Sequence, residues 1–171
     1  MKTQELITRR MVLRSMTLED CDFAASLWGD PQVGEYLNNP PFKNADELRE
    51  IISDIDEWED EYPFIAYDKK TNSPLGTCSL GKEGPEGCWG FGFDVVKDLW
   101  RRGYATEMAQ AMIELAYSLG VRDFYCTVAR DNLAADRVMK KCGLRPAERG
   151  SFKNHQTGVV HESIIYRMTL K

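Results

Sequence analysis

The segment Trp100–Glu107 constrains the fold more than any other part of the chain. It reads Trp-Arg-Arg-Gly-Tyr-Ala-Thr-Glu, follows a β-like run over residues 89–96 and opens a long amphipathic helix. The first turn of a helix leaves backbone N–H groups without intrahelical partners, and the helix dipole adds partial positive charge there. Gly103 has no Cβ, so a ligand can approach the backbone closely, and Arg101 and Arg102 add permanent charge. The segment therefore predicts an anion site suited to a phosphate or pyrophosphate.

A second segment, residues 131–144, places Asn132 at the start of a helical pattern that ends in Cys-Gly-Leu. In order and separation, the two segments resemble the pyrophosphate loop and the Asn-containing helix of the GNAT superfamily of N-acetyltransferases. The family's loop is Gln/Arg-x-x-Gly-x-Gly/Ala, and residues 100–105 match it except at Trp100. Trp at that position is common in the RimJ/RimL-type subgroup, which acetylates ribosomal-protein N-termini. Residues 9–20 also look like the opening of this subgroup, so the resemblance spans nearly the whole chain.

The resemblance implies a GNAT fold of the α/β class, in which helices flank a central, mixed but mostly antiparallel, twisted sheet. It also implies a βαβ unit that binds acetyl-CoA as co-substrate, with the pantetheine arm paired to the central strand and the pyrophosphate on the loop amides. The cofactor-binding residues that it implies are Phe93, Val95, Trp100, Arg101, Arg102, Gly103, Tyr104, Ala105, Thr106 and Asn132. For Asn132 the alternative role is only to cap the helix that it begins.

Three groups that often carry the chemistry in this family are replaced here. Many members have a Tyr general acid seven residues after the Asn, where this chain has Met139. The RimJ/RimL-type pattern often has Ser three residues after the Asn, where this chain has Ala135. Some members carry a Glu in the first half of the central strand, where Trp89 and Gly90 stand. Catalytic residues therefore have to be sought from the residues themselves.

Gly90, Gly92 and Asp94 alternate along the expected central strand and so share one face of it. The two glycines leave an open groove, and Asp94 points into this groove unless a bulge intervenes, as it often does in the family. We expect Asp94 to be the catalytic base, with Glu86 as the second candidate; a hydrogen-bonded structural carboxylate is the alternative for both. A strong base is not obligatory, because an N-terminal α-amine has a pKa of roughly 8 and is partly neutral at physiological pH.

Composition sets broad limits on function. The 171 residues predict a single domain over 1–171, and the net charge of −5 disfavours nucleic acid as a partner. No apolar run reaches membrane-spanning length and the first residues lack a secretory signal, so no membrane partner and a cytoplasmic location are expected. Five cysteines without a Cys-x-x-Cys pair suit reduced thiols. His155 and His161 lack metal-ligand spacing, and no metal site is expected.

The hydrophobic pattern predicts the elements along the chain. Strands are expected over residues 6–14, 63–68, 75–80, 88–96, 123–129, 146–152 and 160–169. Helices are expected over residues 18–28, from Asn44 through Trp58, over 104–119 and over 132–142, the last capped by Asp131. Met108, Met112, Leu115 and Leu119 form the expected buried stripe of the third helix. The second helix has a strongly acidic outer face, which we interpret as solvated; the alternative is a wall that attracts a cationic acceptor.

Together these features predict an acyltransferase that uses acetyl-CoA and acetylates a primary amine by direct attack of the amine on the thioester. The RimJ/RimL-type likeness favours the α-amine of a protein N-terminus as acceptor. A small-molecule amine acetyltransferase and a non-catalytic acyl-CoA-binding protein remain alternatives. A nucleotide is disfavoured, because the chain has neither a Gly-x-x-x-x-Gly-Lys-Ser/Thr nor a Gly-x-Gly-x-x-Gly motif. The sequence leaves both a monomer and a homodimer open.

Overall fold

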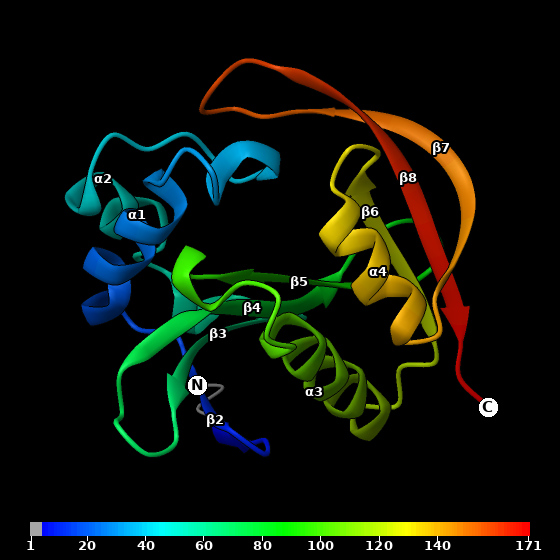
Figure 1. The fold of residues 1–171 in the computed structure, drawn as a ribbon, viewed down its shortest axis with the longest axis horizontal. Helices are drawn as coiled ribbons and strands as arrows, with labels where there is room; N and C mark the ends of the chain where they lie inside the picture. Colours follow the sequence, from blue (N-terminus) through cyan, green and yellow to red (C-terminus); the bar gives the residue numbers. More distant parts are fainter. Residues whose placement is uncertain (1–4) are drawn as a thin grey trace.

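The structure is a computed structural model that describes residues 5–171 (Figure 1). The strands are β1 (Glu5–Ile7), β2 (Met11–Ser15), β3 (Glu61–Asp68), β4 (Pro74–Lys82), β5 (Trp89–Val95), β6 (Asp123–Ala129), β7 (Arg145–Lys153) and β8 (Val160–Thr169). The helices are α1 (Cys21–Gly29), α2 (Ala45–Ile51), α3 (Tyr104–Ser118) and α4 (Leu133–Lys141). The strands form one sheet in the order β1-β2-β3-β4-β5-β6-β8-β7. All neighbouring strands are antiparallel except β5 and β6, which confirms the expected α/β class and mixed sheet.

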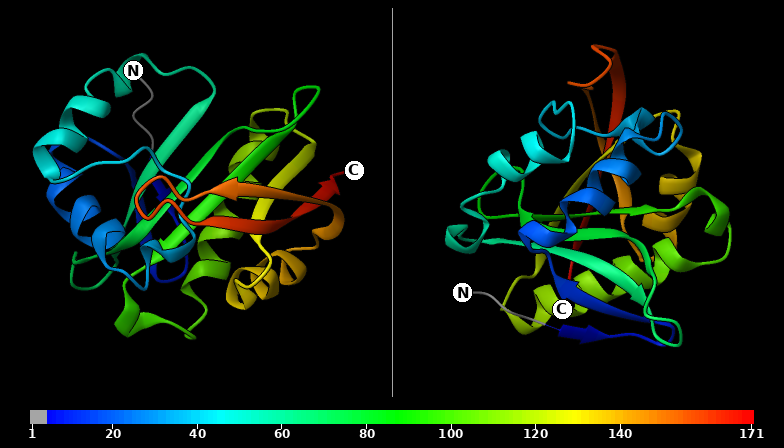
Figure 2. Two further views of the ribbon diagram at one scale, coloured as in Figure 1. Left: turned by 90° about the horizontal axis from the view of Figure 1, so that it is seen from above. Right: turned by 90° about the vertical axis from the view of Figure 1, so that its left-hand side faces the viewer.

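Helices cover both faces of the sheet, α1 and α2 on one and α3 on the other (Figures 1 and 2). Alternation along β3 shows the division: Phe64 and Ala66 belong to the core under α3, whereas Ile65 belongs to the core under α1 and α2. Met108 and Met112 of α3 are fully buried in the larger core. Two apolar cores thus hold the sheet between helices, and the strand edges remain as the places where the backbone can meet a ligand.

Strands β5 and β6 lie side by side but separate almost at once. Trp89 and Phe124 form the one pair of their parallel ladder, whereas β5 pairs with β4 from Trp89 to Val95 without a break. The carboxyl end of β5 leads into the loop before α3, and that of β6 leads into α4. Ligands of α/β sheets bind outside the carboxyl ends of neighbouring parallel strands, where a crevice opens. Here that crevice lies between the starts of α3 and α4.

The β7–β8 hairpin arches back over the α1–α2 side of the molecule (Figure 1). Asn154, at the tip, is fully buried and donates through Nδ2 to the carbonyl oxygens of Gly34 and Glu35, at 2.8 and 3.1 Å. Its Oδ1 accepts from the amides of Gln156 and Thr157 at 2.9 and 3.1 Å. The side chain therefore closes the hairpin turn and fixes it to the segment after α1, although the two are far apart in the sequence.

The predicted single strand over residues 6–14 is wrong. A turn over residues 8–10 divides it into β1 and β2, and the Thr8 amide donates to Met11 O at 2.9 Å to close the turn. The cause is not local, because both Thr8 and Arg10 are held by Glu107 of α3. A contact nearly a hundred residues away in the sequence thus interrupts a favourable strand pattern.

Two helix predictions also need correction. The helix that begins after Asn44 ends at Ile51 and does not reach Trp58; a turn and a short 3-10 helix (Ile55–Glu57) follow. Acidic side chains crowd this stretch, and like charges three and four residues apart oppose a continuous helix. Leu119 is 41% exposed and not part of the buried stripe, because α3 ends at Ser118 and Leu119 is its C-cap.

Candidate active site

A cavity of about 680 Å³ opens where β5 and β6 separate, between these strands, β4, the start of α4 and the segments around α1 and α2. Tyr36 and Phe152 line it on the side of the hairpin tip. Its polar lining includes Thr77, Ser79, Glu83, Asp94, Thr127 and Asn132. A volume of this size suits a small ligand or the reacting ends of two ligands.

The loop before α3 has the geometry of an anion site. Arg101 and Gly103 both have positive φ, of 62° and 83°, and Gly103 is the N-cap of α3. Such left-handed residues turn successive amides toward one side, and a non-glycine residue held in this conformation often marks a functional loop. Within residues 5–171, the backbone amides from Arg101 to Thr106 donate to no protein acceptor. Arg101 and Arg102 are exposed beside them, so the predicted concentration of donors and positive charge is present.

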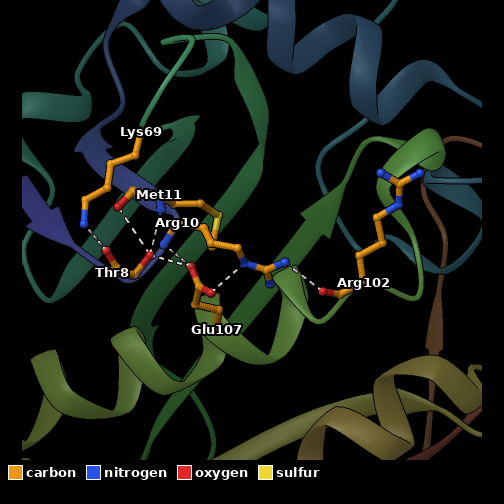
Figure 3. Close-up of polar contacts among 6 residues, drawn as sticks. All are labelled: Thr8, Arg10, Met11, Lys69, Arg102 and Glu107. Atoms are coloured by element: carbon orange, nitrogen blue, oxygen red, sulfur yellow. Dashed lines mark hydrogen bonds and ion pairs between the residues drawn. The ribbon is translucent and has the colours of Figure 1, made fainter.

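Glu107 and Arg10 hold this loop in place (Figure 3). Arg10 Nε contacts Glu107 Oε1 at 3.0 Å, and its Nη1 donates to the carbonyl oxygen of Arg102 at 2.9 Å. Thr8 Oγ1 donates to Glu107 Oε2 at 2.6 Å, and the Arg10 guanidinium lies 3.9 Å from the centroid of the Tyr104 ring. Burial acts to raise the pKa of Glu107, but the hydrogen bonds from Thr8 and Arg10 outweigh it and lower that pKa. The carboxylate is thus ionised and fixes the turn of residues 8–10 against the loop.

Trp100 connects the loop to the central strand. Its indole Nε1 donates to the carbonyl oxygen of Val95, the last residue of β5, at 2.7 Å, while 43% of the residue remains exposed. Val95 is buried in the core under α3, and Phe93 is half-buried and lines the cavity. Beyond Trp89, the edge of β5 that faces β6 has no ladder partner among residues 5–171, so this edge can pair with an extended ligand.

Asn132, not Asp131, caps α4, which corrects the predicted cap. Asn132 Oδ1 accepts from the amide of Ala135 at 3.2 Å. The residue also lines the cavity, and its Nδ2 makes no hydrogen bond among the described residues. Capping therefore leaves the Nδ2 group of the same side chain free to donate to a ligand. Ala135 and Met139 line the same wall and are buried, which leaves no hydroxyl at either position.

Asp94 lies on the cavity face of β5, paired across the ladder with Thr77 of β4. The β4–β5 register is continuous, so Gly90, Gly92 and Asp94 share one face without a bulge. Thr77 Oγ1 donates to Asp94 Oδ2 at 3.3 Å and accepts from Trp28 Nε1 at 3.2 Å. Burial of the carboxyl group raises the pKa of Asp94 to about 7, against the opposing effect of the hydrogen bonds from Thr77 and Trp28. A carboxyl group with this pKa exchanges a proton near neutral pH.

The second predicted carboxylate, Glu86, does not reach the cavity. It is exposed in the connection between β4 and β5, with a φ of 55°, and it is not among the lining residues. Glu83, three residues earlier, lines the cavity instead. Sequence reasoning missed it because its position depends on how the β4–β5 connection folds back, and the signal available was the Gly-Pro-Glu-Gly turn that follows it.

Comparison with known proteins identifies the family. The model of the acetyltransferase (GNAT) domain matches residues 10–145. The chain belongs to the GNAT acetyltransferases. The uncharacterized N-acetyltransferase p20 of Bacillus licheniformis is 30% identical over 141 residues, which cover 80% of this chain and 79% of p20.

Solved structures of GNAT acetyltransferases share the fold. Spermidine N-acetyltransferase from Vibrio cholerae, solved with CoA and spermine, superposes with a TM-score of 0.81 at 17% identity, over 94% of this chain and 95% of that one. Ribosomal-protein-S5-alanine acetyltransferase from Vibrio fischeri gives 0.80 at 11% identity, over 97% and 96%. The predicted GNAT fold is therefore confirmed. At these identities the likeness carries the fold and not the acceptor.

Family membership confirms that the chain is an N-acetyltransferase with acetyl-CoA as co-substrate. The residues present fit that co-substrate, since the loop presents free amides and arginines and the β5 edge is unpaired. In the described part of the chain, no helix has the length and apolar character needed to cross a membrane. The same residues include no group of three His, Cys, Asp or Glu side chains placed to hold a metal ion.

The contacts of Glu107 predict that it controls the loop. In Glu107→Gln, Arg10 loses its ionic partner and no longer holds the Arg102 carbonyl, so acetyl-CoA should bind roughly 5–30-fold more weakly, or about 1–2 kcal/mol. Isothermal titration calorimetry measures this directly. Glu114→Gln, on an exposed position of the same helix, is the control and should bind like the wild type. Equal affinity of the two variants would show that the ion pair does not support the loop.

The raised pKa of Asp94 predicts a pH-dependent stability. Its pKa is about 7 in the folded protein, against an ordinary value of 3.8, so folding takes up a proton and the wild type loses stability as pH rises from about 4 to about 7. Asp94→Asn should therefore gain stability relative to the wild type over this window, by on the order of 1–2 kcal/mol, because water in the cavity screens part of the effect. Urea unfolding at pH 5 and pH 8 measures the difference. Asp98→Asn, at an exposed position, serves as control. A difference in free energy of unfolding between Asp94→Asn and the wild type that is the same at pH 5 and pH 8 would contradict the raised pKa of Asp94.

Proposed function

We propose that this enzyme acetylates the free α-amine of a protein or peptide N-terminus, with Asp94 as the general base. One observation carries the proposal: Asp94 lies on the open cavity face of β5, one residue before the end of the strand that continues into the loop with the free amides from Arg101 to Thr106. The acyl donor and a proton acceptor can thus meet on opposite sides of one strand. Gly92 on that face leaves room for the amine.

The pKa of Asp94 favours an α-amine over an alkyl amine. Transfer of a proton from an α-ammonium group, with a pKa of roughly 8, to a carboxylate with a pKa of about 7 is uphill by about 1.4 kcal/mol. The same transfer from a lysine-like ammonium, with a pKa of roughly 10.4, costs about 4–5 kcal/mol. A base of this strength therefore suits the weaker amine.

The chain's own residues supply three functions. The amides of Arg101 to Thr106, with Arg102, hold the pyrophosphate of acetyl-CoA. The free edge of β5 near Phe93 and Val95 pairs with the pantetheine arm, and the Asn132 amide group donates to it. Asp94 then takes one proton from the ammonium group of the acceptor.

The transfer balances without a tyrosine or serine hydroxyl. Once Asp94 holds the first proton, the neutral nitrogen forms a bond to the thioester carbonyl carbon and the C–S bond breaks. The second proton of the nitrogen passes to the departing CoA thiolate, and Asp94 returns its proton to water. Met139 and Ala135, which line the wall beside Asn132, cannot donate a proton, so the acceptor itself serves as the acid.

A small-molecule amine is the second candidate acceptor. The segment after α1 and the hairpin tip that Asn154 attaches to it both contribute residues to the cavity wall, and a cavity of this volume also suits a small ligand.

All five cysteines are free, four of them buried, which supports a location in the reducing cytoplasm.

The donor site is tested by binding of acetyl-CoA. We expect micromolar affinity for the wild type and at least a ~100-fold loss in Gly103→Glu, because the substitution strains a positive φ and places negative charge among the anion-binding amides. Gly158→Ala is the matched control: it also has a positive φ, of 76°, with open space around it, but lies far from the loop. An equal loss of acetyl-CoA affinity in both variants would show that backbone strain alone weakens binding. No binding of acetyl-CoA by the wild type would refute the donor site.

The base is tested by the pH dependence of the rate with N-terminal peptides as acceptors. For the wild type, kcat/KM should rise with pH through an apparent pKa of about 7, because the ionised carboxylate is the active form. Asp94→Asn should lower kcat by roughly 100-fold or more and remove this titration. A variant that retains both the rate and the profile of the wild type would rule out Asp94 as base.

A further inference from the structure

The carboxylate of Glu83 occupies the place of a side chain that Gly90 lacks. Glu83 follows the last residue of β4, and its amide donates to the Cys88 carbonyl at 3.0 Å, so the connection folds back onto β5. A Cβ on Gly90 would stand 2.1 Å from Glu83 Oε2 and 2.7 Å from the Tyr125 carbonyl oxygen. Any larger residue at position 90 would displace the carboxylate, so Glu83 can lie there only because residue 90 is glycine.

Strand β6 holds Glu83 from the other side of the crevice. Burial raises the pKa of Glu83, and hydrogen bonds from the hydroxyl and the backbone amide of Thr127 oppose that effect. Thr127 and Glu83 both line the cavity. The carboxylate therefore lies between β5 and β6 near the place where the two strands separate, and burial keeps its pKa above the ordinary value.

The space over Gly92 lies between two carboxylates. Gly90, Gly92 and Asp94 follow one another on the same face of β5 at intervals of roughly 6.6 Å. A Cβ on Gly92 would meet nothing closer than Ser79 Oγ at 3.5 Å, so this position is open. On this face, Glu83 stands over Gly90 on one side of Gly92, and Asp94 lies on the other side.

Little positive charge opposes these carboxylates. Lys82 is the one lysine or arginine among the described residues that line the cavity, and its Nζ is paired with Asp60 at 2.5 Å. Glu61 lines the same cavity and adds further negative charge. A cation is therefore favoured over Gly92, whereas a carboxylate there would face repulsion from both sides.

We propose that the acceptor's ammonium group binds over Gly92 between Glu83 and Asp94, and that Glu83 selects amines without a neighbouring carboxylate. The proposal rests on the acetyltransferase function proposed above. The positive charge of the bound ammonium group favours the ionised form of Glu83, which holds the cation, while Asp94 receives the proton. Free amino acids are excluded by their α-carboxylate, and peptide N-termini, whose first carboxyl group is an amide, are accepted.

Glu83→Gln tests the proposal because it keeps the shape of the side chain and removes its charge. The acceptors are a tripeptide amide with a free N-terminus, alaninamide and free alanine. For the tripeptide amide, KM should rise at least 10-fold with kcat within threefold of the wild type, and KM for acetyl-CoA should not change. The preference of the wild type for alaninamide over alanine, which we expect to exceed 100-fold, should shrink at least 10-fold.

Glu86→Gln is the matched control, since Glu86 lies in the same connection but outside the cavity. It should behave like the wild type in every assay. The proposal is overturned if Glu83→Gln retains the KM and the preference of the wild type. A fall in kcat with unchanged KM would also overturn it, because Glu83 would then act in the chemical step and not in acceptor binding.

A binding measurement separates failure of this proposal from failure of the proposed function. If the wild type acetylates none of the acceptors, the function proposed above is refuted. Acceptor binding at Glu83 is then tested separately, by NMR of protein with 13C-labelled glutamate carboxyl groups. The resonance absent from Glu83→Gln is that of Glu83. In the CoA-bound protein it should shift on addition of the tripeptide amide and not on addition of alanine. A resonance that stays in place with both would overturn the proposal.

Discussion

The separation of β5 from β6 after a single pair is the constraint on which the rest of the structure depends. Two neighbouring parallel strands would ordinarily satisfy each other's backbone groups. Here the ladder stops at Trp89 and Phe124, so a free strand edge and the starts of α3 and α4 face one crevice. The amides from Arg101 to Thr106 add donors without protein partners. This unsatisfied hydrogen-bonding capacity suits the crevice to an extended, phosphorylated ligand such as acetyl-CoA.

The loop before α3 is kept in one conformation by residues outside it. Glu107 points from the first turn of α3 to Arg10 and Thr8, and Arg10 in turn holds the carbonyl of Arg102. The helix start, the edge of the sheet and the loop are therefore a single polar unit, in which the pKa of the carboxylate is lowered. Preorganisation of this kind matters because the ligand then meets amides that are already oriented. It also explains why a strand that is favourable by sequence is broken at residues 8–10.

The sequence predicted best what depends on local spacing. The loop before α3, the α/β class and the shared face of Gly90, Gly92 and Asp94 follow from a helix start and from strand alternation. The errors come from longer-range causes or from a choice between neighbours. Asn132 and Asp131 can both cap a helix, and only the path of the chain decides that Asn132 does so. Glu83 was missed because its carboxylate is placed by the return of the β4–β5 connection and by Thr127 on another strand; the Gly-Pro-Glu-Gly turn after Glu83 indicates a turn but not the strand that the carboxylate meets.

The two carboxylates on the cavity face explain how this enzyme can act without the hydroxyl groups of its relatives' patterns. Met139 and Ala135, on one wall of the site, cannot donate a proton to the leaving thiolate. A primary ammonium acceptor carries three N–H protons and the amide product keeps one: the first leaves to Asp94, and the second passes to the departing thiolate. The requirement on the protein is then only to attract the cation and to remove one proton at neutral pH. In the proposed mechanism Glu83 attracts the cation and Asp94 removes the proton, because Glu83 stands over Gly90 while Asp94 lies beyond Gly92 on the same face of β5. Burial raises the pKa of both carboxyl groups, to about 7 for Asp94. Acceptor choice and proton transfer thus become properties of one strand face, with glycine at the two positions where a side chain would separate them.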